Sequence, residues 1–291
     1  MSADVVITEF TDPACPWAFS AEPFRLRLDW LYGDAIEWRP RMVGLSESPE
    51  EYEEKGLTPE RLAGATAKIA ADHGMPIQTA PPPRMQATLP ACRAVVAARV
   101  HAPEAERPLL RSLRVRNFSG QLLDEPDTIA GAARDAGLSP SDIEAWTAQE
   151  QVEAALRADM AEAREPMPAA RVLDARLANW SGGRRYTCPS YEIRRESDGV
   201  RIAVPGFQPF AAYDVVLANL VPDRTRRDAP AGVDDVLGWA GMPLATREVA
   251  EICELEDREA REQLGRGAEE RLVGAAGFWT LSVAANCEAS A

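Results

Sequence analysis

A cysteine placed between a strand and a helix is the feature that most constrains this chain. Residues 5–10 form an apolar, alternating run that predicts a strand, and the next residues read Thr-Asp-Pro-Ala-Cys-Pro-Trp-Ala. Pro16 suits the first position of a helix, because an N–H at that position has no partner within the helix. Cys15 would then meet the unpaired N–H groups and positive dipole end of that helix. We therefore expect its thiol to be more acidic and more reactive than an ordinary cysteine.

The motif at residues 12–18 resembles the active-site signature Asp-Pro-x-Cys-Pro-Trp-Cys of the DsbA family of thioredoxin-fold proteins, including its cytosolic FrnE-like branch. The second cysteine of that signature is Ala18 here, so the usual resolving thiol is missing. The resemblance implies that Cys15 is the nucleophile, open to a substrate groove, and that Pro16 and Trp17 bind substrate. Trp17 has an alternative interpretation as a plain core residue.

A second landmark is the sequence Thr187-Cys188-Pro189. The resemblance places a cis-proline at Pro189, facing Cys15, and assigns Thr187 and Pro189 to substrate binding. A backbone exposed beside that proline would pair with an extended substrate segment. The family normally has an apolar or hydroxylic residue where this chain has Cys188. We hypothesise that Cys188 replaces the lost resolving thiol and attacks a mixed disulfide at Cys15. Alternatively, Cys188 is a small buried filler.

A low-molecular-weight thiol is the second route for resolving a mixed disulfide at Cys15. Glutathione or mycothiol would serve as co-substrate, as a thiol does in the similar kappa-class glutathione transferases and hydroxychromene-carboxylate isomerases. Arg184 and Arg185 precede the proline loop and would hold a carboxylate of such a thiol, or else are solvated charges. We expect no tightly bound cofactor, and no metal, because no Cys-x-x-Cys or His-x-x-x-His spacing occurs.

The order of predicted elements divides the chain into an α/β core and an insertion. Strand, helix (kinked at Pro23) and strand are followed by helices from about 50 to 178, and then by strands at 187–194 and 200–204 and a helix at 210–220. This order resembles a thioredoxin-like core with a large DsbA-like helical insertion, spanning residues 1–221.

A linker at 222–233 leads to a small unit at 234–291, where two short helices and a two-stranded wing resemble a winged helix-turn-helix. Between residues 230 and 291, twelve acidic residues face five basic ones. That charge excludes a DNA-binding role, so we expect a packing or protein-contact module.

Bulk composition narrows the function classes further. A net charge of −14 argues against nucleic acid and anionic membranes as partners. Neither a secretory signal nor an apolar run long enough to span a membrane occurs, so we expect a cytoplasmic protein. Five cysteines, an odd number at irregular spacing, do not form a disulfide scaffold.

Two functions from different classes remain. The first is a thiol-disulfide oxidoreductase acting on protein or small-molecule disulfides, with Cys15 as nucleophile. The second is a non-catalytic adaptor on a degenerate thioredoxin fold, similar to the SpxH adaptors that deliver a client to a protease. The loss of the thiol at Ala18 and the acidic C-terminal unit both fit a protein that holds a partner.

Overall fold

A four-stranded sheet carries the cysteine motif in this computed structural model, which describes residues 3–282. Its strand order is β2-β1-β5-β6, with β1 (Val5–Thr11), β2 (Ile36–Met42), β5 (Ser190–Arg195) and β6 (Arg201–Val204). β1 runs parallel to β2 and antiparallel to β5, and β6 is antiparallel to β5. β1 lies inside the sheet and is almost wholly buried, which explains its apolar sequence.

The helix that follows the cysteine is interrupted, as its second proline predicts. α1 (Pro16–Ser20) and α2 (Glu22–Tyr32) meet at Ala21, and Pro23 occupies the first turn of α2, where its missing N–H leaves no partner unpaired. α2 and α11 (Phe210–Leu220) supply apolar side chains to one buried cluster with β1 and β5. The predicted α/β core is therefore present.

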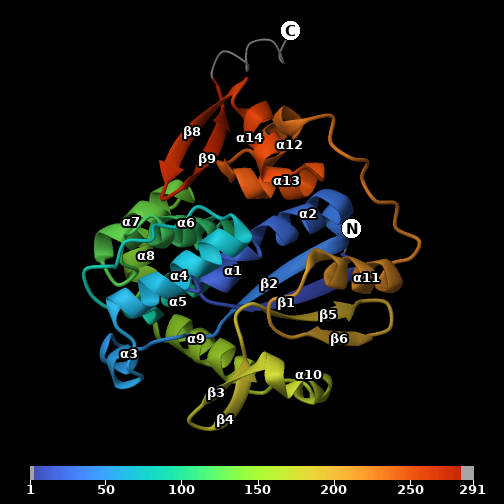
Figure 1. The fold of residues 1–291 in the computed structure, drawn as a ribbon. Coiled ribbons are helices and arrows are strands. Elements are labelled where there is room, and N and C mark those ends of the chain that lie inside the picture. The colour runs from blue at the N-terminus through green and yellow to red at the C-terminus, as the bar shows by residue number, and fades with distance from the viewer. Residues whose placement is uncertain (1–2, 283–291) are drawn as a thin grey trace.

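Helices fill the chain between β2 and β5, as expected. They are α3 (Glu50–Glu54), α4 (Pro59–His73), α5 (Leu89–His101), α6 (Glu106–Phe118), α7 (Pro126–Asp135), α8 (Pro140–Thr147), α9 (Glu150–Ala163) and α10 (Pro168–Val172), with 3-10 turns at Pro103–Ala105 and Asp174–Arg176; a further 3-10 turn, Gly33–Ala35, precedes β2. α5 is apolar nearly all round, and it lies at the centre of this bundle (Figure 1). The helical insertion is confirmed.

The segment before the proline loop differs from the prediction. A hairpin of β3 (Leu177–Trp180) and β4 (Gly183–Tyr186) occupies a stretch that we expected to be the end of the insertion and a loop. The strand predicted from 187 begins at Ser190, because Pro189 has no N–H to contribute to the sheet. Ser181 and Gly182 form the hairpin turn, and Gly183 begins β4 with φ +128°, so the Gly-Gly pair was the signal that sequence reasoning missed.

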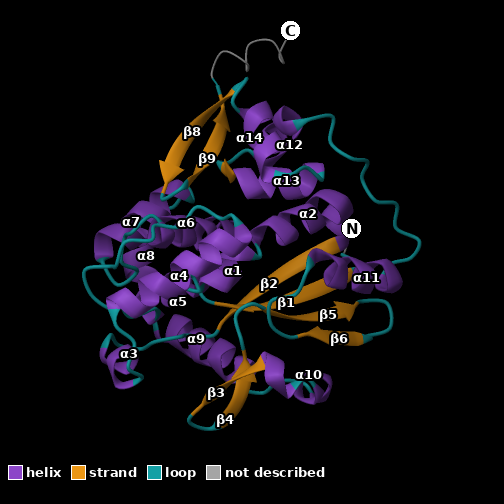
Figure 2. Cartoon of the chain, in the orientation of Figure 1, coloured by secondary structure: helices purple, strands orange, loops and turns teal. Residues whose placement is uncertain are grey.

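The C-terminal unit contains the predicted helices and wing together with further elements. They are α12 (Val233–Ala240), β7 (Leu244–Ala245), α13 (Thr246–Cys253), α14 (Asp257–Leu264), β8 (Ala268–Val273) and β9 (Ala276–Leu281), with strand order β7-β9-β8. Residues 221–232 connect this unit to α11 without helix or strand, along one side of the molecule (Figure 2). The winged-helix assignment and the exact domain boundaries stay predictions.

The C-terminal unit shares a hydrophobic core with α2. Leu26 and Trp30 of α2 are buried in one cluster with Val236, Leu237 and Val249 of the C-terminal unit. The unit is therefore packed firmly on the rest of the chain, and removing it would expose the apolar face of α2 to water. In the described part of the chain, no helix has the length and apolar character needed to cross a bilayer.

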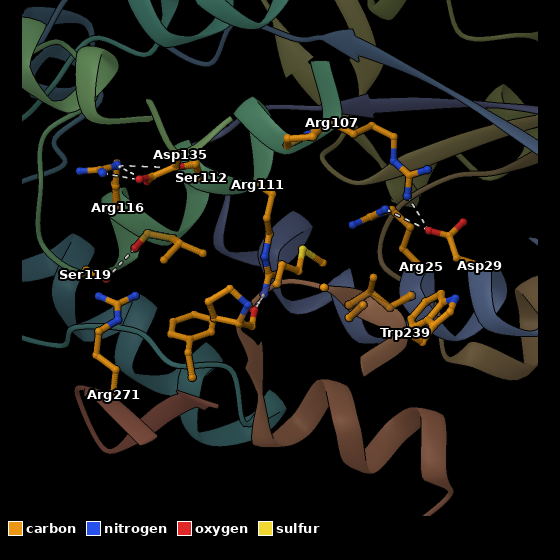
Figure 3. Close-up of a pocket in the computed structure, with 18 of the residues that line it drawn as sticks. Arg25, Asp29, Arg107, Arg111, Ser112, Arg116, Ser119, Asp135, Trp239 and Arg271 are labelled. Carbon is orange, nitrogen blue, oxygen red and sulfur yellow. Dashed lines mark hydrogen bonds and ion pairs between the residues drawn. The ribbon is translucent and has the colours of Figure 1, made fainter. Parts of the chain in front are cut away.

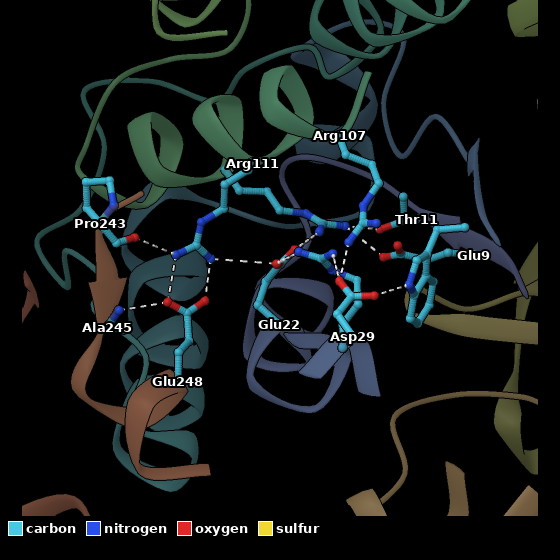
Figure 4. Close-up of polar contacts among 12 residues, drawn as sticks. Glu9, Thr11, Glu22, Asp29, Arg107, Arg111, Pro243, Ala245 and Glu248 are labelled. Atoms are coloured by element: carbon cyan, nitrogen blue, oxygen red, sulfur yellow. Dashed lines mark hydrogen bonds and ion pairs between the residues drawn. The ribbon is translucent and has the colours of Figure 1, made fainter. Parts of the chain in front are cut away.

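A buried chain of charges joins the sheet to the C-terminal unit (Figure 4). Arg114 of α6 pairs with Glu9 of β1 at 3.0 Å and with Glu22 of α2. Arg111, one turn earlier on α6, lies 3.7 Å from Glu22 and forms a bidentate pair with Glu248 of α13. All five side chains are at least nine-tenths buried, so each charge depends on its partners.

Candidate functional site: a pair of buried thiols

Cys15 lies at the start of α1, as the sequence predicts. Its extended backbone (φ −81°, ψ 113°) makes it the N-cap residue, and its carbonyl oxygen accepts the hydrogen bond from the N–H of Phe19. The Cys15 Sγ donates a hydrogen bond to the carbonyl oxygen of Cys188, 3.2 Å away. The two cysteines therefore meet, although 173 positions separate them in the sequence.

The loop that brings Cys188 to Cys15 is fixed by its own hydrogen bonds. The peptide bond between Cys188 and Pro189 is cis. On one side of it, the Thr187 hydroxyl donates to the carbonyl oxygen of Arg176 at 3.0 Å. On the other, the Ser190 hydroxyl donates to the Thr187 carbonyl oxygen at 2.7 Å and accepts from the N–H of Gly206 at 2.9 Å.

Both thiols are more enclosed than expected. Cys15 is 6% exposed and Cys188 is 8% exposed, within an apolar cluster that includes Phe10, Leu177 and Tyr186. The expectation that Cys15 opens to a substrate groove is therefore wrong for this conformation. The physical reason is that the insertion and the β3–β4 hairpin, which the sequence could not place, contribute apolar side chains over the thiols.

The surroundings shift the pKa values of the two thiols in opposite directions. A hydrogen bond from the Cys188 side chain lowers the pKa of Cys15, although burial works against it, and the N–H groups of Ala18 and Trp17 lower it further. Burial raises the pKa of Cys188 well above its ordinary value, and the neighbouring Cys15 raises it again. Cys15 is thus the more acidic of the two, as expected for the nucleophile.

Asp12 anchors the loop before Cys15, a role that sequence reasoning did not assign. Its buried carboxylate accepts hydrogen bonds from the N–H groups of Ala14 and Leu45 and from the Thr88 hydroxyl, each at 2.9 Å. The thiol of Cys92 on α5 lies 3.4 Å away. Burial raises the pKa of Asp12, and a negative charge there would raise the pKa of Cys15. The Asp-Pro pair before the cysteine was the available signal.

Trp17 lies on the surface beside the thiols rather than in the core. Its side chain is 40% exposed and packs against Phe207 and His73, with ring centroids 5.4 and 5.2 Å away. The alternative interpretation as a plain core residue is therefore wrong. Pro16 is half-buried in the same turn.

The two arginines before the proline loop have different surroundings. Arg184 is held by an ion pair with Asp174, with nitrogen–oxygen distances of 2.8 and 3.0 Å. Arg185 is half-buried, donates to the carbonyl oxygen of Tyr186 and contributes a positive charge that lowers the pKa of Cys188. Arg185 is therefore the cation that acts on the second thiol.

Of the other described cysteines and histidines, Cys92 contacts Asp12 and His73 packs against Trp17. Cys253 is half-buried on α13, and Cys287 lies outside the described residues. Across residues 3–282, no group of three or more Cys, His, Asp or Glu side chains is arranged to hold a metal ion.

This chain matches a known protein family and several solved structures. The model of the DSBA-like thioredoxin domain matches residues 6–167, more than half of the chain. The chain belongs to this family. Solved structures with the same fold include a putative protein disulfide isomerase from Nitrosomonas europaea (TM-score 0.57, 18% identity, 75% of this chain and 98% of that chain). Another is the cytosolic disulfide reductase DsbM from Pseudomonas aeruginosa (TM-score 0.52, 17% identity, 74% of this chain and 99% of that chain).

A curated relative matches over a longer stretch of this DSBA-like chain. The ClpXP adapter protein SpxH from Halalkalibacterium halodurans is 26% identical over 266 residues, which cover 89% of this chain and 81% of the relative. A match of that length extends past the linker into the C-terminal unit, whereas the two structures above cover three quarters of the chain or less.

Proposed function

We propose that this protein is a thiol-disulfide oxidoreductase in which Cys15 attacks a disulfide and Cys188 resolves the product. The observation that carries the proposal is the contact between the Cys15 Sγ and the Cys188 carbonyl oxygen, at 3.2 Å, beside a cis-proline. The contact places Cys188 next to Cys15. Ala18 has no thiol with which to resolve a mixed disulfide, so a second cysteine is needed for that step.

The proposed exchange has two steps, and one disulfide forms for each disulfide that is reduced. The Cys15 thiolate attacks one sulfur of a substrate disulfide and displaces the other half as a thiolate, forming a mixed disulfide at Cys15. The Cys188 thiolate then attacks the Cys15 sulfur, releases the second half of the substrate and leaves a Cys15–Cys188 disulfide. One substrate disulfide is reduced while the protein dithiol is oxidised. Two molecules of a small thiol return the protein to the dithiol, forming one small-molecule disulfide.

The order of the two steps follows from the charges at the site. Cys15 attacks first because its pKa is lowered while that of Cys188 is raised. Once Cys15 is part of a mixed disulfide it carries no charge, so one cause of the raised pKa of Cys188 disappears. Arg185 then favours the Cys188 thiolate. Attack by Cys188 is thus promoted by completion of the first step.

The surface beside the two thiols indicates what kind of substrate would bind there. The exposed ring of Trp17 beside the thiols would contact an apolar part of a protein or small-molecule disulfide. Glutathione, or another small thiol such as mycothiol, would act as the reductant; the similar DsbM has been solved with GSH (TM-score 0.50, 17% identity). Such chemistry belongs in a reducing compartment, and we propose the cytoplasm.

Trapping of the intermediate tests this function. The Cys188→Ser variant, incubated with oxidised glutathione, should accumulate a glutathione adduct on Cys15, because nothing resolves it. The wild type should accumulate little adduct, and Cys15→Ser should form none at that position. Equal adduct on Cys15 in the wild type and in Cys188→Ser would show that Cys188 does not resolve it.

An adaptor role is the second candidate, and one observation favours it. The SpxH match extends through the linker into the C-terminal unit, a part of the chain that a redox core alone does not require. In that role the C-terminal unit would contact a protein partner, and the enclosed thiols would be structural.

Genetic complementation separates the two candidates. A double variant, Cys15→Ser with Cys188→Ser, would be introduced into a strain that lacks this protein. Under the oxidoreductase proposal the variant fails to restore the wild-type thiol redox state. Under the adaptor proposal it restores the wild-type abundance of the client protein, because binding does not need the sulfur atoms.

A further inference from the structure

A cavity lies between α2 and α6 of the core and the C-terminal unit (Figure 3). Its volume is about 1050 Å³, which is the size of a site for a small organic molecule. Its walls come from α2, α6 and the loop after α6 on one side, and from the end of α12, the turn before β7 and the β8–β9 hairpin on the other.

Arginine is frequent in the lining of this cavity. Five arginines reach it: Arg25, Arg107, Arg111, Arg116 and Arg271. Three carboxylates also line it: Asp29, Glu104 and Asp135. Two further carboxylates, Glu22 and Glu248, pair with Arg25 and Arg111, so the charges of these two arginines are already balanced. An arginine in a concave wall attracts an anion when no carboxylate neutralises it.

The arginines differ in how far they are already neutralised. Arg107 pairs with Asp29, and Arg116 pairs with Asp135 at 2.7 Å. Arg271 of β8 forms no ion pair with any residue in the described part of the chain and lies over the ring of Phe278, 5.6 Å from its centroid. Arg271 therefore presents a guanidinium whose hydrogen-bond donors remain available at one end of the cavity (Figure 3).

The cavity also has apolar lining residues. Leu26, Val115, Met242 and Phe278 are among them, and Trp239 lies at the end away from Arg271 (Figure 3). The ring of Trp239 is held edge-on against the buried Trp30, with centroids 5.2 Å apart. A rigid apolar wall next to a guanidinium suits a ligand that has a flat apolar group and an anionic group.

We propose that this cavity binds a small organic anion, a carboxylate or a phosphate ester with an aromatic or similarly flat apolar group. The anionic group would pair with Arg271 and the apolar group would lie between Phe278 and Trp239. The inference is independent of the chemistry at Cys15, which lines no part of this cavity. Because both walls would contact the ligand, its binding would stabilise the packing of the C-terminal unit on the core.

Calorimetric titration with three matched probes tests the proposal: 1-naphthyl phosphate, 1-naphthoate and the neutral 1-naphthol. We expect at least one of the two anions to bind one molecule per chain, at least tenfold more tightly than naphthol. Comparison of the two anions distinguishes a phosphate site from a carboxylate site. Failure of both anions to bind, or equal binding of naphthol, would overturn the proposal.

Substitutions of lining residues test whether the anion binds in this cavity. Arg271→Ala should weaken binding of the preferred anion about tenfold, the typical effect of losing one charge-assisted hydrogen bond. Arg258→Ala, on the exposed face of α14 and paired with Glu262, is the matched control and should leave binding unchanged. Val115→Glu would place a negative charge among the apolar lining residues of the cavity and should abolish anion binding. Unchanged binding in both cavity variants, with folding confirmed by circular dichroism, would contradict the proposal.

Discussion

The Sγ of Cys15 and the carbonyl oxygen of Cys188 are 3.2 Å apart, and this contact joins the start of the first core helix to the loop before β5. A separate hydrogen bond from the Cys188 side chain lowers the pKa of Cys15, whereas burial raises the pKa of Cys188. A pair of thiols with unequal acidity has a preferred direction of attack, because the thiolate is the reactive form.

The pH dependence of alkylation should differ between Cys15 and Cys253. The pKa of Cys15 is lowered from the value of 9.0, whereas burial raises that of Cys253 to about 11. Cys15 should therefore reach half of its maximal alkylation rate below pH 9, and Cys253 well above it. Mass spectrometric mapping of iodoacetamide adducts in a Cys287→Ser background measures both rates in one sample. A Cys15 rate that rises only above pH 9 would remove the electrostatic basis for its role.

The absolute rate at Cys15 should be limited by its enclosure. Only 6% of the residue is exposed, so the segment that covers it must open before a reagent can reach the sulfur. We expect alkylation of Cys15 in the native protein to be at least tenfold slower than in urea at the same pH, with the difference shrinking in mild denaturant. Equal rates in native and unfolded protein would mean that the thiol is open in solution.

Replacement of Arg185 should slow the second step of the exchange. Its charge lowers the pKa of Cys188, so Arg185→Ala should reduce the Cys188 thiolate population at neutral pH. The measurement is the conversion of glutathionylated Cys15 into the Cys15–Cys188 disulfide, followed by acid quench and mass spectrometry. We expect conversion to be several-fold slower and its pH profile to move upward. Arg184→Ala is the control, since Arg184 pairs with Asp174; an equal effect in both variants would exclude a specific role for Arg185.

The sequence predicted the location of the thiols better than their accessibility. The motif around Cys15 and the proline after Cys188 follow local backbone requirements, because a helix start and an X–Pro bond are set by neighbouring residues. The thiols lie in an apolar cluster against which Leu45 and Met167, from distant segments, also pack. No local pattern reports such contacts.

The same reasoning explains the other differences between sequence and structure. The linker composition and the separate run of short helices predicted a distinct C-terminal unit, and the unit does form its own sheet. Its attachment to the core could not be read from the sequence, because Trp30 and Glu248 look like ordinary amphipathic-helix residues until the two helices are placed together. The arginine-lined cavity arises only from that packing.

The ion pair of Arg111 and Glu248 should be essential for the packing of the C-terminal unit. Glu248 is fully buried, accepts from the N–H of Ala245 and lies 2.7 Å from the Arg111 guanidinium. Glu248→Gln leaves a buried arginine poorly compensated and should lower the free energy of unfolding by about 3 kcal/mol. Urea unfolding measures the change.

Two comparisons make that result specific. Glu262→Gln, in an exposed pair with Arg258, should change the free energy of unfolding by less than about 0.5 kcal/mol. The double replacement Arg111→Met with Glu248→Leu should recover much of the loss, because no buried charge is then left unpaired. A loss in Glu248→Gln no larger than that in Glu262→Gln would contradict the role of this pair.

Glu106 should make stability depend on pH near neutrality. Burial raises the pKa of this carboxyl from 4.5 to about 7, so the folded protein holds a proton that the unfolded chain has already released. Its contribution therefore favours folding below pH 4.5 and is lost as the pH rises to 7. Glu106→Gln should be more stable than the wild type by about 1–3 kcal/mol at pH 8 and similar to it at pH 4.5. Thermal unfolding at both values checks this; a constant difference between them would refute it.

Mapping the disulfide formed on mild oxidation tests the central claim most directly. The wild-type protein would be oxidised with oxidised glutathione, blocked with an alkylating agent, digested without reduction and analysed by mass spectrometry. We predict a cross-linked pair of peptides that joins Cys15 to Cys188, with Cys92 recovered as a free thiol. Recovery of Cys188 as a free thiol while Cys15 is oxidised would contradict the account.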